Sequence, residues 1–314
     1  MEEACYDRKR EDKNGTFSNK QEKVGRRMKE LYDQYRVLLF TLAYQLTGSA
    51  ADAEDAVQDV FMKSFDLHLE RLEKPKAYLC KMVTNHCLNQ QKSARKRREV
   101  YVGPWLPEPV RTPETETLEM TVARRDLLSY AMLVLLERLT PTERAVFVLR
   151  EGLGFDYSEI AELLGKQEAN CRKLVSRAKS KMEISEQEAV AAETVELEWV
   201  NRFLTSLEQG NVEHVLSLLT EDVMLVADGG GKVTAFRHPI QTRDHVARVL
   251  LDGFQGKGTI YQGKLCFEVA TLNGETGFII RSGEETLAAI LIQLRHGKLA
   301  RMYAVRNPEK LARV

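Results

Sequence analysis

The chain has 314 residues, 43% of them apolar, and its 46 basic and 46 acidic side chains give a formal net charge of zero. This length predicts two or three domains with real cores, and the neutral balance excludes any prediction of a partner from global charge. The five cysteines are scattered without a C-x-x-C pair, which is typical of a reducing cytosol. Because the charged N-terminus lacks a secretion signal and no segment is apolar enough to span a membrane, we expect a cytoplasmic protein.

The first structured unit predicted from the sequence is a bundle of three amphipathic helices over residues 28–98. We expect the first helix over about 28–47, the second from a capping pattern at Ser49, and the third from Pro75 to about Arg98. Residues 92–98 carry five positive charges and no acid. Such a cluster indicates phosphate binding, although the solvated end of a surface helix gives the same pattern.

Three segments have the composition of tails or linkers. Residues 1–27 are polar, and we expect a disordered tail. Residues 99–121 contain four prolines and cannot form one helix, so they predict a tether, and residues 184–193 form a short acidic linker. The tether contains the motif WLPEP (residues 105–109), and its Trp105 exposes a large apolar surface unless it docks on another part of the protein. An incidental tryptophan in a flexible linker is the alternative.

A second helical unit is expected over residues 122–183, and it contains a helix-turn-helix at 155–178. Asp156 begins a capping pattern, and Gly165 follows the last apolar residue of the first helix, where a left-handed helix end favours glycine. From Lys166 to Lys181 there are six basic residues and one acid. A basic second helix after such a turn fits the major groove of DNA, and an ordinary helical hairpin with a solvated basic face is the alternative.

Residues 194–306 predict an α+β cone, in which helices precede a curved antiparallel sheet. Asn273-Gly274 is a strong hairpin turn, and His296-Gly297 is a second. The helices are expected over about 194–208 and 211–219, and the strands over 223–227, 233–236, 259–271, 276–282, 286–295 and 298–305.

Nothing in this third unit fixes a catalytic site. Its candidate acid–base residues have no diagnostic spacing, and the chain has no nucleophile elbow, zinc motif or Walker lysine, so we expect no enzyme activity, metal or cofactor. The candidates are Asp222, Asp228, His238, Asp244 and Tyr261. The run DGGGK (residues 228–232) fits a glycine hairpin between two strands best, and a mobile phosphate-binding nest is the alternative.

Two segments resemble a known family. LLFTLAYQLTGSAADAEDAVQDVFMKSF (residues 38–65) resembles region 2 of the extracytoplasmic-function group of bacterial sigma-70 factors, and residues 140–182 are similar to their region 4. The resemblance implies a multidomain protein with two all-α DNA-binding domains and an α+β cone of the SnoaL/NTF2-like type. It also implies core RNA polymerase and promoter DNA as partners, with the polymerase β′ coiled coil and β flap as docking sites.

The family's functional residues carry over to matching positions of this chain. For polymerase binding by the DAEDAVQDVF helix, the resemblance implies Asp55, Gln58, Asp59 and Phe61. For the minus-ten promoter element it implies Asn85, Asn89, Lys92, Arg95, Lys96, Arg97 and Arg98, although the family often has Asp in place of Asn89. For the minus-thirty-five element it implies base contacts by Glu168, Asn170, Arg172 and Lys173 and backbone contacts by Arg177 and Lys179.

The motifs WLPEP, DGGGK and NPEKL (residues 307–311) together resemble sigma factors with a fused SnoaL-like domain, in which the extension adjusts sigma activity. We therefore expect interdomain regulation, with or without a small ligand in the last domain, through Trp105, Leu106, Pro107, Glu108, Pro109, Asp228, Gly229, Gly230, Gly231, Lys232, Asn307 and Pro308. Two other functions fit parts of the sequence: a helix-turn-helix regulator that binds DNA without polymerase, and a SnoaL-like enzyme or ligand sensor with a DNA-binding half.

Overall fold

A computed structural model describes residues 3–64, 74–112, 129–182, 193, 195–254 and 265–314, and for residues 3–24 and 91–99 it gives the backbone alone. The first helical domain contains α1 (Glu3–Thr47), α2 (Ala50–Ser64) and α3 (Pro75–Glu99). Buried residues at helical spacing, such as Leu42, Val57 and Val83, form its core. The predicted three-helix bundle is confirmed.

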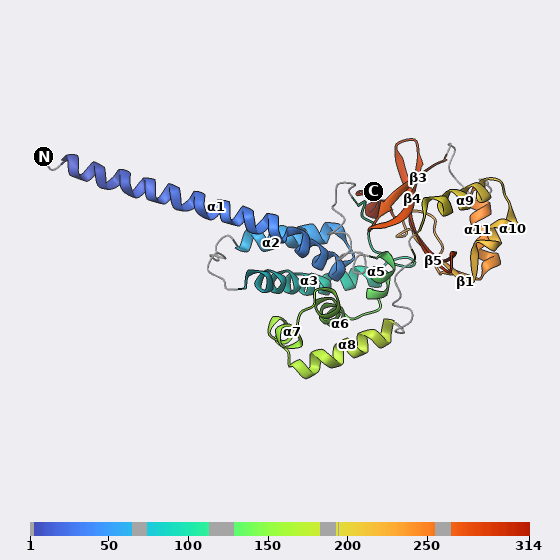
Figure 1. The fold of residues 1–314 in the computed structure, drawn as a ribbon, viewed down its shortest axis with the longest axis horizontal. Coiled ribbons are helices and arrows are strands. Elements are labelled where there is room, and N and C mark those ends of the chain that lie inside the picture. The colour runs from blue at the N-terminus through green and yellow to red at the C-terminus, as the bar shows by residue number, and fades with distance from the viewer. Residues whose placement is uncertain (1–2, 65–73, 113–128, 183–192, 194, 255–264) are drawn as a thin grey trace.

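The prediction of a disordered tail over residues 1–27 is wrong for residues 3–27, whose backbone continues α1. Figure 1 shows this part of the helix projecting away from the three domains. The segment contains no proline and is rich in Glu, Lys and Arg, which favour helices. Its polarity therefore did not predict the backbone conformation.

The second helical domain contains α5 (Tyr130–Leu136), α6 (Pro141–Phe147), the π-helical turn η3 (Val148–Gly152), α7 (Tyr157–Leu164) and α8 (Glu168–Met182). Its helix ends follow the local sequence. Thr140 and Glu143 form a reciprocal capping box at the start of α6, and Gly165 ends α7 in the left-handed conformation, with φ 61° and ψ 41°. The predicted helix-turn-helix is confirmed.

The C-terminal domain is an α+β fold. It contains α9 (Leu197–Glu208), α10 (Val212–Ser217), β1 (Leu219–Asp228), β2 (Ile240–Gln241), α11 (Arg243–Phe254), β3 (Leu265–Leu272), β4 (Glu275–Ser282), β5 (Glu285–Arg295), β6 (Lys298–Val305) and the 3-10 turn η4 (Pro308–Lys310). The six strands lie in the order β2-β1-β6-β5-β4-β3, antiparallel except for the parallel pair β1–β6. Both predicted hairpin turns have two residues with positive φ, as type I′ turns require.

Both faces of this sheet are buried. Side chains such as Leu225 pack under α9 and α11, whereas Val226, Leu272 and Leu291 belong to the core that continues into the helical domains. Figure 1 shows α9, α10 and α11 on the side of the sheet away from α1, α2 and α3. The second sheet face thus makes the C-terminal domain part of one continuous core with the rest of the protein.

Two predictions for this domain are wrong. Residues 233–236 form no strand, and the DGGGK run is no hairpin between strands, because β1 ends at Asp228 and the chain enters a loop that reaches β2. The helix α11 was not predicted, although Val246, Ala247, Leu250 and Leu251 recur at helical spacing. The strand predicted from residue 259 begins at Leu265 in the described part of the chain, because residues 255–264 lie outside it.

Candidate functional site

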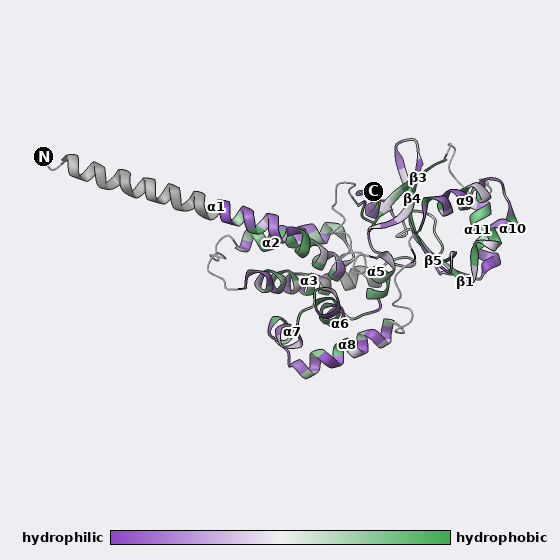
Figure 2. Ribbon diagram, in the orientation of Figure 1, coloured by the Kyte–Doolittle hydropathy of each residue, from purple (hydrophilic) through white to green (hydrophobic). Residues whose placement is uncertain are grey.

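The solvent face of α8 carries all six residues predicted to read or hold DNA at the second element. Glu168, Asn170, Arg172, Lys173, Arg177 and Lys179 are exposed, while Cys171, Val175 and Ala178 on the opposite side are buried. Figure 2 shows hydrophilic residues along this helix on the outside of the molecule. The second helix of the helix-turn-helix therefore presents its polar side to solvent, as a recognition helix must.

The basic residues of α8 differ in whether they form ion pairs within the protein. Arg172 forms an ion pair with Glu168 one turn earlier, and its guanidinium lies over the Tyr157 ring, 4.5 Å from the centroid. Lys179 pairs with Glu151 at 3.2 Å. Among the described contacts, Lys173 and Arg177 have no ion pair, so these two are available to phosphates without breaking one.

The helix α3 presents the residues predicted for the first promoter element. Asn85 and Asn89 are exposed one turn apart on the same side of α3. The same helix continues through the basic residues predicted to hold phosphates, but the structure describes only their backbone. These residues are Lys92, Arg95, Lys96, Arg97 and Arg98.

On α2, three of the four predicted polymerase contacts share an exposed face, namely Asp55, Gln58 and Asp59. Phe61 does not, since it is 8% exposed and its ring packs edge-on against Tyr32, with centroids 5.0 Å apart. Its position on the helix belongs to the buried side, and its contact with polymerase stays a prediction. Met62, 74% exposed, takes its place on the polar face at helical spacing from Gln58.

The linker, the loop after β1 and the C-terminal tail meet at Asp228. This carboxylate is fully buried and accepts hydrogen bonds from the Tyr101 hydroxyl (2.5 Å), the Leu106 N–H (2.9 Å), the Gly230 N–H (3.0 Å) and the Lys310 ammonium (2.8 Å). We call these five residues and Trp105 the Asp228 junction. Each of the three sequence motifs contributes to it, so the structure brings them to one place.

Lys310 is 4% exposed, and its charge is compensated from several sides. Besides the carboxylate, it contacts the Leu106 carbonyl at 2.5 Å and the face of the Trp105 ring, 3.2 Å from the centroid. Such a cation–π contact is strong when both groups are withdrawn from water. Burial and the neighbouring Asp228 raise the pKa of Tyr101 above its ordinary value, so its hydroxyl remains a donor.

The other motif residues support the Asp228 junction from its edges. The Asn307 side chain donates to the Tyr101 oxygen at 3.0 Å, and its N–H donates to the Asp228 carbonyl at 2.9 Å. A Cβ on Gly230, which has φ +60°, would collide with the Asn307 amide, so glycine is required there. The other predicted regulatory residues of these motifs lie around the junction. Gly229 and Gly231 belong to the loop, Lys232 pairs with Glu309 at the surface at 2.7 Å, and Pro308 begins η4.

The rest of WLPEP ties the linker to all three domains. The Glu108 carboxylate accepts the Ala50 N–H at 2.7 Å and the Ser49 hydroxyl at 2.9 Å, so a linker residue caps α2. The Glu108 carbonyl accepts the Tyr44 hydroxyl, which in turn accepts the Asn273 amide at 2.8 Å. Before Glu108, the Pro107 carbonyl accepts the Tyr130 hydroxyl at 2.7 Å. After Pro109, Arg111 and Thr112 pair with the edge strand β3.

The two helical domains also touch each other directly. Arg144 of α6 is 2% exposed and donates to the Gln45 carbonyl of α1 at 2.5 Å and to Glu137 at 2.6 Å. Between the second helical domain and the sheet, Glu275 of β4 accepts the Tyr130 N–H at 3.2 Å, and burial raises the pKa of its carboxyl group to about 7. Arg144, Glu275 and Tyr101 were not predicted as interface residues, because their partners are distant in the chain, and Lys310 was singled out only as part of the NPEKL motif.

The acid–base candidates of the C-terminal domain do not converge. Asp222 pairs with Arg295 at the surface, Asp228 belongs to the junction, and His238 and Asp244 are exposed at different places. Tyr261 lies outside the described residues. Within the described ranges no group of His, Cys, Asp and Glu residues could hold a metal ion, and no helix there is long and apolar enough to cross a membrane.

A helix-turn-helix, a second helical bundle with polar helix faces and a tether between them define a DNA-binding transcription factor. Residues 31–98 match sigma-70 region 2, and residues 129–182 match sigma-70 region 4. The chain is 34% identical over 89% of its length to the ECF RNA polymerase sigma factor SigJ of Mycobacterium tuberculosis, covering 91% of that protein, and 27% identical to the probable sigma factor SigI of the same species, with 88% and 92% coverage.

The crystal structure of the M. tuberculosis SigJ is similar with a TM-score of 0.71 and 30% identity, over 90% of this chain and 97% of that one. The chain therefore belongs to the extracytoplasmic-function sigma-70 family. It is a sigma factor that directs transcription initiation at promoters, and RNA polymerase and promoter DNA are its partners.

Proposed function

We propose that the C-terminal domain holds this sigma factor in a closed, inactive arrangement and that opening of the Asp228 junction releases it. The observation that carries the proposal is the direct contact between the two promoter-reading domains through buried Arg144 and the Gln45 carbonyl. Centres of the minus-ten and minus-thirty-five elements are about 25 base pairs apart, which at 3.4 Å per base pair is about 85 Å. Domains in contact cannot bind both elements, so they must separate.

The contacts of the linker support a role for the C-terminal domain in this closure. Tyr130 of the second helical domain donates to Pro107, and Tyr44 of the first donates to Glu108, while the same linker is fixed to the C-terminal domain through Asp228. Separation of the helical domains therefore requires the linker to leave at least one of these partners. In this proposal the C-terminal domain is a regulator and not a catalyst.

The finer contacts follow from the exposed faces. Asp55, Gln58, Asp59 and Met62 would dock on the β′ coiled coil of polymerase, since an acidic face with an apolar residue suits a basic helical partner. The second helical domain would dock on the β flap. Asn85 and Asn89 would contact unpaired minus-ten bases, and α8 would enter the major groove at the minus-thirty-five element.

In vitro transcription with core polymerase and full-length chain tests the closure. We expect Asp228→Asn to increase initiation by weakening the junction, whereas Asp244→Asn, at an exposed position on α11, should leave it unchanged. If Asp228→Asn binds polymerase normally and initiates no better than the unmodified protein, the junction does not restrain activity.

A further inference from the structure

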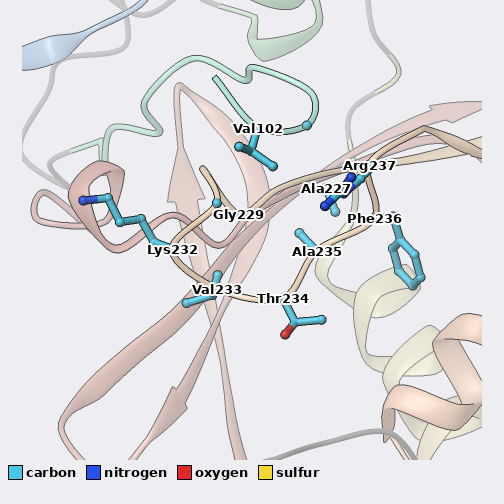
Figure 3. Close-up of a pocket in the computed structure, with 11 residues that line it drawn as sticks. Val102, Ala227, Gly229, Lys232, Val233, Thr234, Ala235, Phe236 and Arg237 are labelled. Atoms are coloured by element: carbon cyan, nitrogen blue, oxygen red, sulfur yellow. The ribbon is translucent and has the colours of Figure 1, made fainter. Parts of the chain in front are cut away.

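A cavity of about 360 Å³ lies between the linker and the loop that follows β1. One wall is formed by Val102 and Gly103 of the linker, and the other by residues of the 229–237 loop together with Ala227 (Figure 3). The linker approaches this loop closely, since a Cβ on Gly103 would lie 3.9 Å from the Arg237 Cα. The cavity thus belongs to the same linker contact as the Asp228 junction but contains none of its side-chain hydrogen bonds.

Arg237 gives the cavity an available positive charge. Its side chain is exposed, and within the described part of the chain it forms no ion pair or hydrogen bond. The other cation of the loop, Lys232, is paired with Glu309 at 2.7 Å, and in Figure 3 it extends away from Arg237. A guanidinium group in this position can bind a carboxylate or phosphate through two parallel hydrogen bonds.

The rest of the lining combines apolar side chains with Thr234 and with glycine backbone. Ala227 and Ala235 lie on the wall opposite the linker, Val102 of the linker is 48% exposed, and Phe236 is 45% exposed. Exposed apolar side chains beside a concave surface favour a ligand that removes them from water. Aliphatic carbon can cover the exposed side chain of Val102, whereas a purely polar ion leaves it in water.

We propose that this cavity binds a small organic anion with an apolar body, whose carboxylate or phosphate head pairs with Arg237. Because the two walls come from the linker and the C-terminal domain, such a ligand binds the closed arrangement and loses one wall when the linker leaves. A ligand that binds one of two states shifts the protein toward that state. The anion therefore represses transcription, and this effect, unlike binding itself, rests on the proposed closure.

Calorimetric titration of the full-length protein tests the binding site. The probes are octanoate, octyl phosphate and inorganic phosphate, so the comparison separates the two head groups from the need for an apolar body. We expect one octanoate or octyl phosphate per chain and at least tenfold weaker binding of inorganic phosphate. Arg237→Gln should weaken the preferred probe at least tenfold, whereas the matched variant Arg248→Gln, at an exposed position on α11 outside the cavity, should not.

The absence of saturable binding by both octyl probes, or equal losses in the two arginine variants, would overturn the site. A second measurement separates the site from its effect: the preferred probe should reduce initiation by the unmodified protein and leave initiation by Arg237→Gln unchanged. If the probe binds at Arg237 and initiation is unaffected, the repressive coupling is wrong although the site exists. Both variants should keep the thermal midpoint of the unmodified protein, because the two arginines are exposed.

Discussion

Replacing Asp228 by asparagine should open the linker without disturbing the shape of the junction. The substitution removes the charge that compensates the Lys310 ammonium, which is 4% exposed. Removing one partner of a buried ion pair costs about 3–5 kcal/mol. The asparagine oxygen can still accept the Leu106 and Gly230 N–H groups, and Trp105 still contacts Lys310, so we expect the lower end of this range.

Amide hydrogen exchange measures this cost locally. The Leu106 N–H is buried and donates to Asp228 in the closed state, so its exchange reports departure of the linker. A loss of about 3 kcal/mol corresponds to exchange about 150 times faster when exchange is limited by the opening equilibrium. In Asp244→Asn, which changes an exposed carboxylate, the rate should stay within a factor of about two.

The double variant Asp228→Asn with Lys310→Met distinguishes an uncompensated charge from lost packing. If the unpaired ammonium causes the opening, removing it should recover part of the protection, because a buried pair replaced by neutral groups of similar size is often close to neutral in stability. An exchange rate at Leu106 that changes less than about threefold in Asp228→Asn would refute the ion pair as the element that holds the linker.

Three further predictions concern other contacts. Glu275 has a pKa of about 7 in the closed state against an ordinary 4.5. The protonated side chain therefore stabilises the fold fully below about pH 4.5, and this stabilisation is lost as the pH rises through 7. The difference between the thermal midpoints at pH 5.5 and pH 8 should be smaller in Glu275→Gln than in the unmodified protein. Glu108→Ala should lower the free energy of urea unfolding by about 0.5–2 kcal/mol through the lost α2 cap, and Glu108→Gln should lower it less. Tyr157→Leu should weaken binding of duplex minus-thirty-five DNA about threefold to fivefold by freeing Arg172, whereas Tyr157→Phe, which keeps the ring, should not; equal losses in both would contradict the stacking role.

Local signals in the sequence predicted what local physics determines. The Asp156 capping pattern, the Gly165 helix end and the Asn273-Gly274 hairpin each depend on residues within a few positions of one another, and all three are confirmed. The same holds for the exposed face of α8, since a helix with one apolar side places its polar side outward.

The errors come from contacts between distant segments. Alternating residues at 233–236 fit a strand, but no neighbouring strand pairs with them. Co-occurrence of the three motifs predicted interdomain regulation, but it could not show that Asp228 and Lys310 form a buried ion pair.

The closed arrangement is too stable to open by thermal motion alone. Separation of the linker and the second helical domain from the sheet exposes residues that are now almost fully buried, including Leu106, Tyr130 and Leu272. At about 1.5–3 kcal/mol for each large apolar side chain, these three contribute about 5–9 kcal/mol before any polar contact is counted. Fewer than about one molecule in a thousand would then be open, so in the proposed mechanism the binding energy of polymerase and promoter drives the separation. The polar Asp228 junction adds little net attraction but depends strongly on geometry, because a small displacement leaves a buried charge without its partner. The buried apolar face stabilises the closed arrangement, and the buried ion pair is lost on a small displacement. Together they favour two distinct states, closed and open, over a continuous range of intermediate arrangements.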